Sequence, residues 1–439
     1  MARTNTKATT ANLKRTHEGA VAKKITPLQE LRRTVLSCLL NENTFYEDGV
    51  SVSDRIKMQV PKVKAQDVAT LAIEARTDYK LRHVPLLLCY IMSHLETHRH
   101  VVKNTLAQVI QRPDEISEYL AMHGDYVKKN LTHASRKGIA EAFKKFNEHQ
   151  LSKYNNLDRK VKLKDALFLS HAKPKDAEQE SLWKRLINNE LVTPDTWEVN
   201  LSVCKTDADK KEVWERLLSE DKLGALALLR NLRNIQSVCV DEKKIKSALR
   251  TAKTERVLPF RFITAARYAP KFEPELERLM YSGLEGVEKL NGKTILLIDK
   301  SGSMDSTVSA KSDMTRFDAA VGLSILAREI CEDVAVYTFN TDVVCVPSRR
   351  GFALRDAMGT PSGGTYTGEA VDHINKKEDY DRLIIFTDEQ SASPLPAPKG
   401  KGYVINVASY QYGIGYGKWV HIDGMSEAVV NYIQEYEQL

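Results

Sequence analysis

The chain has 439 residues, of which 42% are hydrophobic, and a formal net charge of +7. This length exceeds what one ordinary hydrophobic core can organise, so we expect two or three domains. No uncharged apolar run approaches the roughly 20 residues that a membrane-spanning helix needs. The N-terminus lacks the apolar core of a signal peptide. We therefore expect a cytoplasmic protein that does not associate with membranes, with a flexible basic tail over residues 1–25.

The charge is distributed unevenly along the chain. Residues 1–270 carry 48 lysines and arginines against 33 acids (+15), and residues 271–439 carry 17 against 25 (−8). The positive excess of the first part favours a polyanionic partner such as nucleic acid, and a merely solvated basic surface is the alternative. The six cysteines are scattered without a CxxC pair, which is typical of reduced thiols.

Residues 26–283 show a helical pattern at nearly every step. Segments such as KAQDVATLAIEARTDY and KLGALALLRNLRNI repeat apolar residues at i, i+3, i+4 and i+7. Pro113 and Pro194 are each followed by an acid, as expected near helix starts. A dozen or so helices with short turns predict an all-α, HEAT-like solenoid of stacked helical pairs, although no fixed sequence period is visible.

The period changes in residues 284–439. Short apolar runs such as KTILLID and DRLIIFTDE suit buried parallel strands, and amphipathic segments such as MTRFDAAVGLSILAREICE lie between them. Alternating strands and helices predict an open, doubly wound (Rossmann-like) α/β sheet. Ligands of such sheets bind at the carboxyl ends of the strands. The chain is therefore predicted to be multidomain, with a helical part followed by an α/β part.

Polar residues gather at the predicted strand ends of the α/β part. The motif DKSGSM follows the first strand, the glycine-flanked threonine of SGGTYTG precedes a helix, and FTDE ends a later strand. All the donors are oxygens, which suit Mg²⁺, Mn²⁺ or Ca²⁺. Thr367 is a less favoured substitute for the threonine, and turn capping by short polar residues is the structural alternative. The candidate metal ligands are Asp299, Ser301, Ser303, Thr365 and Asp388.

The familiar catalytic motifs are absent or incomplete. Ser301 lacks the GxSxG elbow, and no histidine stands where a hydrolase triad would place its base. The stretch GIGYGKW lacks the first glycine of a Walker loop and has Trp419 after its lysine. His94 and His98 share a helix face but miss the HExxH zinc motif. We therefore predict a protein that is not an enzyme.

The five oxygen ligands resemble the metal-ion-dependent adhesion site of von Willebrand factor A domains, in that family's chain order. The resemblance implies that the two serines and the threonine bind the metal directly. It also implies that the two aspartates bind directly or through water, and that an acidic group of a partner protein completes the coordination.

The helical part, together with the α/β part, resembles the TROVE module of Ro autoantigen-type RNA-binding proteins over essentially the whole chain after the tail. The motifs that carry the resemblance are LLNENTFYEDG, RHVPLLL, SRKGIAEAFKKFNEHQLSKY, VKLKDALFLSHAKPK and VLPFRF. The resemblance implies a monomer in which the solenoid closes into a ring. It implies that the ring binds small noncoding (Y-type) RNA on its outer face and single-stranded RNA ends in its central hole. The implied role is RNA quality control or processing, possibly beside an exoribonuclease.

A cluster of basic residues lies in the corresponding segments of the helical part. Cationic side chains bind the phosphate oxygens of RNA, and a neutral histidine can hydrogen-bond to RNA or stack on a base. A solvated helix face is the alternative, and so is a metal-dependent adhesion scaffold that binds no RNA. The candidate RNA contacts are Arg136, Lys137, Lys144, Lys160, Lys164, His171 and Lys173. Weaker candidates are Lys128, Lys129, Arg230 and Arg233, and a packing role is expected for Tyr46 and Arg82.

Overall fold

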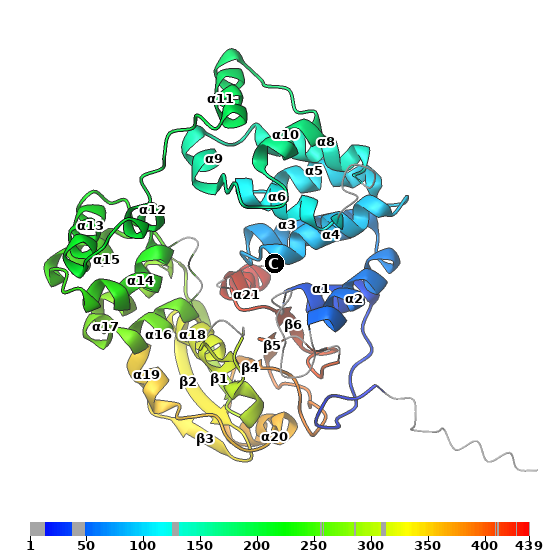
Figure 1. The fold of residues 1–439 in the computed structure, drawn as a ribbon. Coiled ribbons are helices and arrows are strands. Elements are labelled where there is room, and N and C mark those ends of the chain that lie inside the picture. The colour runs from blue at the N-terminus through cyan, green and yellow to red at the C-terminus, as the bar shows by residue number, and fades with distance from the viewer. Residues whose placement is uncertain are drawn as a thin grey trace, which may run out of the picture. The chain divides into compact units, whose positions relative to one another are not determined.

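The computed structural model describes residues 14–36, 49–124, 131–254, 257, 259–284, 287–308, 313–408, 410, 412–426 and 428–438. The chain forms two compact units. The helical unit lies within residues 49–285, and the sheet unit combines residues 286–439 with the N-terminal residues up to 38. Figure 1 labels the elements of both units. In the described part of the chain, no helix has the length and apolarity that crossing a membrane would require.

The helical unit contains short helices joined by short turns. Several begin at side-chain caps, such as Thr132 before α8 and Asp176 before α11, whose oxygens accept from backbone N–H groups of the first turn. The described α-helices are α2 (Gly49–Gln59), α3 (Ala65–Thr77), α4 (His83–His94), α5 (Arg99–Val109), α6 (Pro113–Ala121), α8 (His133–Phe143), α9 (Glu148–Tyr154), α10 (Leu163–Ser170), α11 (Ala177–Asn188), α12 (Trp197–Ser202), α13 (Asp207–Ser219), α14 (Ala225–Ser237), α15 (Glu242–Thr251), α16 (Phe260–Tyr268) and α17 (Glu273–Tyr281).

These helices pack mainly on near neighbours in the chain. α3 contacts α4 and α5, α5 contacts α8, and α13, α15 and α17 pack in succession. Most of these helices bury one apolar face; α14, for example, buries Leu228, Leu232 and Ile235. Such neighbour-to-neighbour packing is typical of stacked helical pairs, so the predicted all-helical character of this part is confirmed.

The sheet unit contains one six-stranded sheet in the order β3-β2-β1-β4-β5-β6. All neighbouring strands are parallel except β3, which pairs antiparallel with β2. The apolar runs predicted as parallel strands do pair in parallel, and the antiparallel β3, which was not predicted, makes the sheet mixed. The strands are β1 (Leu290–Asp299), β2 (Cys331–Phe339), β3 (Val343–Val346), β4 (Arg382–Thr387), β5 (Lys401–Asn406) and β6 (Val420–Asp423).

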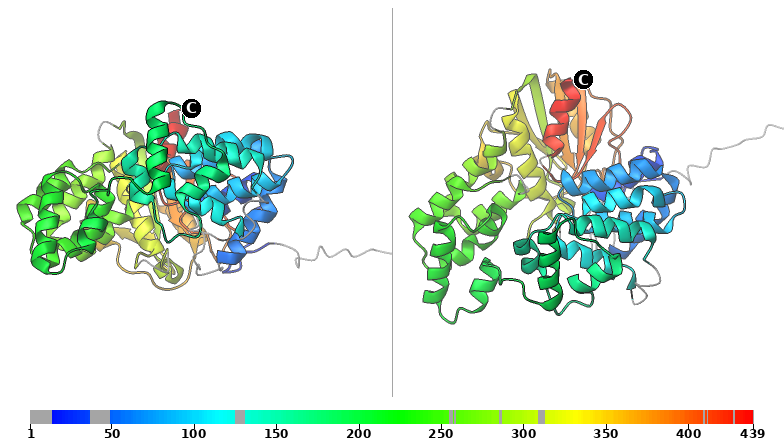
Figure 2. Two further views of the ribbon diagram at one scale, coloured as in Figure 1. Left: turned by 45° about the horizontal axis from the view of Figure 1, so that its top comes forward. Right: turned by 90° about the horizontal axis from the view of Figure 1, so that it is seen from above.

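Helices cover both faces of the sheet, as in a doubly wound fold. α18 (Arg316–Glu329) packs on β1, β2 and α21 (Ala428–Gln438), and Figure 2 shows α21, in red, lying along the sheet. On the opposite face, Val371 and Ile374 of α20 (Thr367–Lys377) share a buried cluster with Ile295 and Leu297 of β1. The short helix α19 (Gly351–Ala357) lies between β3 and α20 in the chain. The central strand β1 is therefore covered on both faces. Its carboxyl end lies at the end of the sheet where the parallel strands finish, which is called the carboxyl edge below.

The N-terminal segment differs from the prediction of a flexible tail over residues 1–25. Residues 1–13 lie outside the described part, but the residues from 14 onward contact the sheet unit. Thr16 Oγ1 donates to the carbonyl of Ser391 at 2.7 Å, the His17 amide donates to Gln390 Oε1 at 2.7 Å, and Ala20 is buried in the core cluster. These hydrogen bonds and the burial of Ala20 hold the segment against the sheet unit.

The first helix, α1 (Pro27–Leu36), also belongs to the sheet unit, although we expected the helical module to begin at residue 26. Arg33 is fully buried. It pairs with Glu389, and its Nε donates to the Tyr410 carbonyl at 2.6 Å. A buried guanidinium needs a carboxylate partner, and Glu389 provides it. This ion pair anchors α1 beside β6, whose His421 lies 3.2 Å from Arg33.

Candidate functional site

The candidate metal residues meet at the carboxyl ends of β1 and β4. These strands are parallel neighbours, with Ile298 opposite Phe386, so Asp299 and Asp388 follow them at the same edge. Asp299 is fully buried. Its Oδ1 accepts from the Ser301 amide at 2.8 Å, and its Oδ2 accepts from Thr387 Oγ1 at 2.6 Å. The first carboxylate is thus held rigidly beneath the DxSxS turn.

The two serines of that turn connect Asp299 to Asp388. Ser301 Oγ lies 3.3 Å from Ser303 Oγ, which donates to Asp388 Oδ2 at 2.7 Å. Ser301 is buried, and Ser303 is half-buried. The structure therefore brings four of the five predicted ligands into one hydrogen-bonded group.

The loop that carries Thr365 is tied to the same turn through its backbone. The Gly302 amide donates to the Gly363 carbonyl at 2.9 Å, and the Ser362 amide donates to the Lys300 carbonyl at 2.8 Å. Thr365 itself is buried. Thr367, the predicted substitute, opens α20, and its buried hydroxyl makes no hydrogen bond to the described residues. Both threonines remain candidates by position.

The charges at this edge favour a cation. Burial and the nearby Asp388 raise the pKa of Asp299 above its ordinary value. The Arg316 guanidinium lies 3.3 Å from Asp388 Oδ2 and is itself buried. The site thus holds two buried carboxylates and a single guanidinium, which pairs with one of them. With the two serine hydroxyls, the carboxylates form an oxygen-only set that fits a hard divalent ion. No trio of His, Cys, Asp or Glu with metal-site spacing occurs among the described residues, which agrees with a set of only two carboxylates.

The candidate RNA contacts lie on or beside two helices that pack against each other. α8 carries Arg136 and Lys137, ends at its C-cap residue Lys144, and buries Ile139 and Phe143. α10 carries Lys164, contacts α8, and ends at the C-cap His171. Lys160 precedes α10 and Lys173 follows it. Lys137, Lys160, His171 and Lys173 are exposed, whereas Arg136, Lys144 and Lys164 are half-buried.

Some of the neighbouring basic residues already have protein partners. Lys144 Nζ lies 3.1 Å from Glu141 Oε1. Lys145 Nζ donates to the Ala107 and Ile110 carbonyls near the C-terminus of α5. Arg233 lies over the Tyr268 ring. Lys128, Lys129 and Tyr46 lie outside the described residues.

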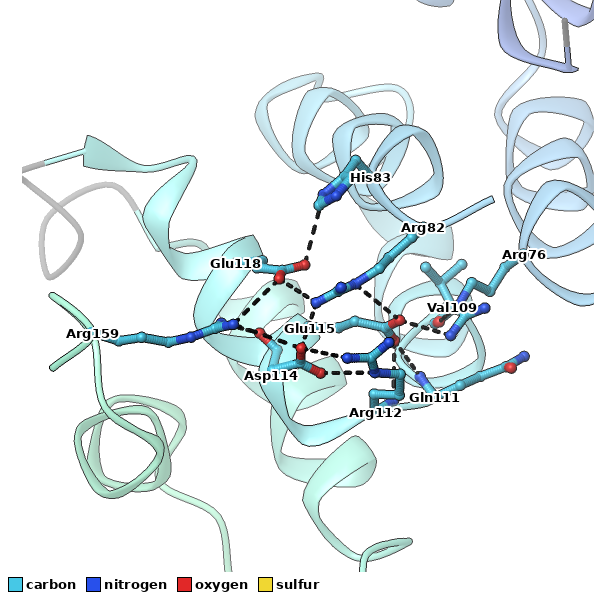
Figure 3. Close-up of polar contacts among 10 residues, drawn as sticks. All are labelled: Arg76, Arg82, His83, Val109, Gln111, Arg112, Asp114, Glu115, Glu118 and Arg159. Atoms are coloured by element: carbon cyan, nitrogen blue, oxygen red, sulfur yellow. Dashed lines mark hydrogen bonds and ion pairs between the residues drawn. The ribbon is translucent and has the colours of Figure 1, made fainter. Parts of the chain in front are cut away.

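A network of charged residues on α6 joins several helices of the helical unit (Figure 3). The acids Asp114, Glu115 and Glu118 face arginines from three other segments. Arg82 pairs with Asp114 and Glu118, so this residue, expected only to pack, anchors α4 to α6. Arg112 Nη2 lies 2.8 Å from Asp114 Oδ2.

The same network holds the segment that leads into α10. Arg159 Nη1 donates to the Asp114 carbonyl at 3.1 Å, and its Nη2 lies 3.6 Å from both Asp114 Oδ2 and Glu118 Oε1 (Figure 3). Arg159 is the residue before Lys160. The acids of α6 therefore position a basic segment that the sequence placed on the candidate RNA surface.

Sequence reasoning missed the role of these acids and of Arg316. The acids after Pro113 marked a helix start, and nothing in the local pattern showed that arginines 30 to 45 residues away would converge on them. Arg316 follows the helix cap Thr315, and its proximity to Asp388 depends on the packing of α18 against β1 and β4.

Comparisons with known proteins find a family model that matches part of the chain, a relative of that part, and a solved structure with the same fold. The TROVE domain model matches residues 184–279. The mouse (Mus musculus) telomerase protein component 1 is 34% identical over 92 residues, which are 20% of this chain and 3% of that protein, so this chain spans a small fraction of its relative. The crystal structure of the Deinococcus radiodurans RO (RSR) protein matches with a TM-score of 0.60 at 18% identity, covering 94% of this chain and 100% of the other. Residues 184–279 thus match the TROVE domain, and the chain has the fold of the Deinococcus radiodurans RO (RSR) protein.

Proposed function

We propose that this protein is a non-catalytic RNA-binding protein of the Ro type. The observation that carries the proposal is the basic surface of α8 and α10, on a chain with a TROVE domain and a Ro-like fold. The side chains that neutralise phosphates are Arg136, Lys137, Lys144, Lys160, Lys164 and Lys173, and His171 supplies a hydrogen bond or a stacking surface.

The finer parts of the proposal follow from the family resemblance. The helical unit closes into a ring, binds small Y-type RNA outside and single-stranded RNA ends within, and serves RNA quality control or processing. An exoribonuclease is the partner that such a role calls for, and the protein acts as a cytoplasmic monomer.

The sheet unit is proposed to be a von Willebrand factor A-like domain with a metal site. Asp299, Ser301, Ser303, Thr365 and Asp388 would hold Mg²⁺, Mn²⁺ or Ca²⁺. The bound ion would supply a positive charge to which an acidic group of a protein partner can attach.

The experiment that tests the proposal is recovery of RNA with the protein. The protein is purified at low salt, bound RNA is sequenced, and the protein is then incubated with that RNA. We expect small structured RNAs that dissociate at high salt and remain intact during incubation. Absence of RNA together with metal-dependent capture of an acidic protein would instead support an adhesion scaffold, and degraded RNA would support an enzyme.

A further inference from the structure

The helical unit contains a cavity of about 730 Å³. None of the candidate metal residues lines it, and of the candidate RNA residues only Arg230, one of the weaker ones, does. Its walls come from α9, the start of α12, the start of α14 and the segment after α15. A volume between roughly 300 and 1,000 Å³ is typical of small-molecule sites. Most of this lining falls within residues 184–279, the part that matches the TROVE domain.

The first turn of α14 forms one wall of the cavity. Gly224 is the N-cap residue and has no side chain to cap the helix. The Leu228 amide is the first to bond within the helix, to the Gly224 carbonyl at 2.9 Å. The preceding amides, those of residues 225–227, therefore remain at the cavity wall with the positive end of the helix dipole, an arrangement that attracts anions.

Basic side chains converge on the same cavity. Lys153, Lys222, Arg230 and Lys253 line it, against the acids Asp195 and Glu198. Arg230 and Lys253 form no ion pair within the described part of the chain.

Asp195 offsets one of these charges, because it pairs with Lys222 at 2.7 Å. It also pairs with Arg216 at 2.8 Å, and both partners hold its pKa well below the ordinary value. Lys153, Arg230 and Lys253 then stand against Glu198, so the cavity keeps an excess of positive charge beside the uncapped helix.

An aromatic ring is fixed at the cavity wall. Trp197 lines the cavity and stacks on Trp214, with ring centroids 6.1 Å apart and planes 21° apart. Trp214 is buried, so the Trp197 ring has a rigid support. Aromatic side chains held in this way are the surfaces on which nucleic-acid bases stack.

We propose that this cavity binds a terminal nucleotide, that is, a phosphomonoester attached to an aromatic base. The phosphate lies against the first turn of α14, where Arg230 and Lys253 neutralise its charge, and the base packs on Trp197. The ligand is either a free mononucleotide or the 5′-phosphorylated end of an RNA strand. Binding of an RNA end, the second of these ligands, rests on the proposed function.

The test compares ligands with and without the phosphate by isothermal titration calorimetry on the full chain. The probes are adenosine 5′-monophosphate, adenosine, inorganic phosphate, and a short single-stranded RNA with a 5′-phosphate or a 5′-hydroxyl. We expect the monophosphate to bind at least about tenfold more tightly than adenosine or inorganic phosphate if the ligand is a free nucleotide. If only the phosphorylated RNA shows this preference over the hydroxylated RNA, the ligand is a strand end.

Two substitutions of one residue provide a matched pair of variants. A Cβ at Gly224 meets no atom within 4 Å, so Gly224→Ala should retain binding. Gly224→Asp places a carboxylate at the N-cap, where aspartate favours helix formation but repels a phosphate. It should lower the affinity for the phosphorylated ligand at least about tenfold. Arg230→Ala should also lower this affinity.

The proposal is overturned if no phosphorylated probe is preferred over its unphosphorylated counterpart, or if Gly224→Asp binds like Gly224→Ala. Failure of the proposed function has a different signature, because 5′-hydroxyl RNA would then not bind to the surface of α8 and α10. If that surface binds RNA, Gly224→Asp should leave its affinity for 5′-hydroxyl RNA unchanged.

Discussion

Arg136 and Lys137 are adjacent on α8, and their neutralisation of phosphates can be measured through salt. Each phosphate contact contributes about 0.7 to 0.9 to the slope of log K against log salt. The double variant Arg136→Ala/Lys137→Ala should therefore flatten the slope by about 1.4 to 1.8. Fluorescence anisotropy with a labelled RNA at several salt concentrations gives this slope.

The control for that pair removes two exposed lysines elsewhere in the helical unit. Lys184 lies on α11 and Lys243 on α15, and both are exposed. The variant Lys184→Ala/Lys243→Ala changes the net charge equally, and its slope should match that of the parent. If both pairs flatten the slope to the same extent, the binding is a diffuse charge effect without a defined surface.

His421 is a buried histidine whose pKa links stability to pH. Burial and the nearby Arg33 lower its pKa to about 4, although Asp423 opposes the shift. Its Nε2 also lies 3.1 Å from Glu389, and its ring stacks on Tyr416. The folded protein keeps the ring neutral while the unfolded chain protonates near pH 6.5.

The sign of this effect is a loss of stability at acid pH. As pH falls from about 6.5 to about 4, this histidine should remove up to about 3 kcal/mol from the free energy of unfolding. His421→Gln should lack that part of the pH dependence. The measurement is urea unfolding of both proteins between pH 7 and pH 4, and parallel pH curves would contradict the assignment.

At the scale of elements, the acids of α6 organise the helical unit around the candidate RNA surface. Asp114→Asn keeps the size of the side chain but removes the charge that faces Arg82, Arg112 and Arg159 (Figure 3). The acid is buried and its partners are partly exposed, so we expect a loss of about 1 to 3 kcal/mol in the free energy of unfolding. Hydrogen exchange in residues 155–162 should also accelerate.

The comparison variant for Asp114→Asn is Glu141→Gln. Glu141 pairs with Lys144 on the surface of α8, where an exposed ion pair contributes little. Its free energy of unfolding should change by less than about 0.5 kcal/mol. Unchanged exchange in residues 155–162 of the Asp114→Asn protein would show that the network does not position this segment.

Local sequence patterns predicted the helices and strands whose apolar residues are periodic or continuous. The helices of residues 49–284 have periodic apolar faces, and β1 is a buried apolar run that ends in an acid. β3 escaped prediction because Val344 and Cys345 are exposed on a four-residue edge strand. The docking of the N-terminal segment escaped it because Arg33 and Glu389 are 356 residues apart, and no local pattern relates them.

The candidate site shows the same division. Asp299, Ser301, Ser303 and Asp388 could be predicted to meet, because parallel strands bring their carboxyl ends to one edge. The position of Arg316 against Asp388 could not, since it depends on how α18 packs across the sheet. Likewise, the sequence identified Arg230 only as a weak basic candidate, and only the fold places it with Trp197 around a cavity.

At the scale of the whole molecule, the two candidate sites should work independently, because they belong to different units. Asp299→Ala and Ser303→Ala should lose divalent-metal binding and keep the RNA affinity of the parent. Asp305→Ala, which removes an exposed acid from the same turn, should keep both. Calorimetry with Mn²⁺ and anisotropy with RNA report the two activities separately. If both site variants still bound Mn²⁺, the metal would have to bind at other residues.

The proposed function requires that the protein bind RNA and select single-stranded ends. The most direct measurement labels a hairpin with a single-stranded 3′ extension and competes it with a blunt hairpin and with an unrelated single strand of the same length. The proposed passage through the ring admits a single strand and excludes a duplex, and its cationic walls contact phosphates and not base edges. The unrelated strand should therefore displace the labelled RNA far better than the blunt hairpin does. Equal displacement by the two competitors would contradict the account.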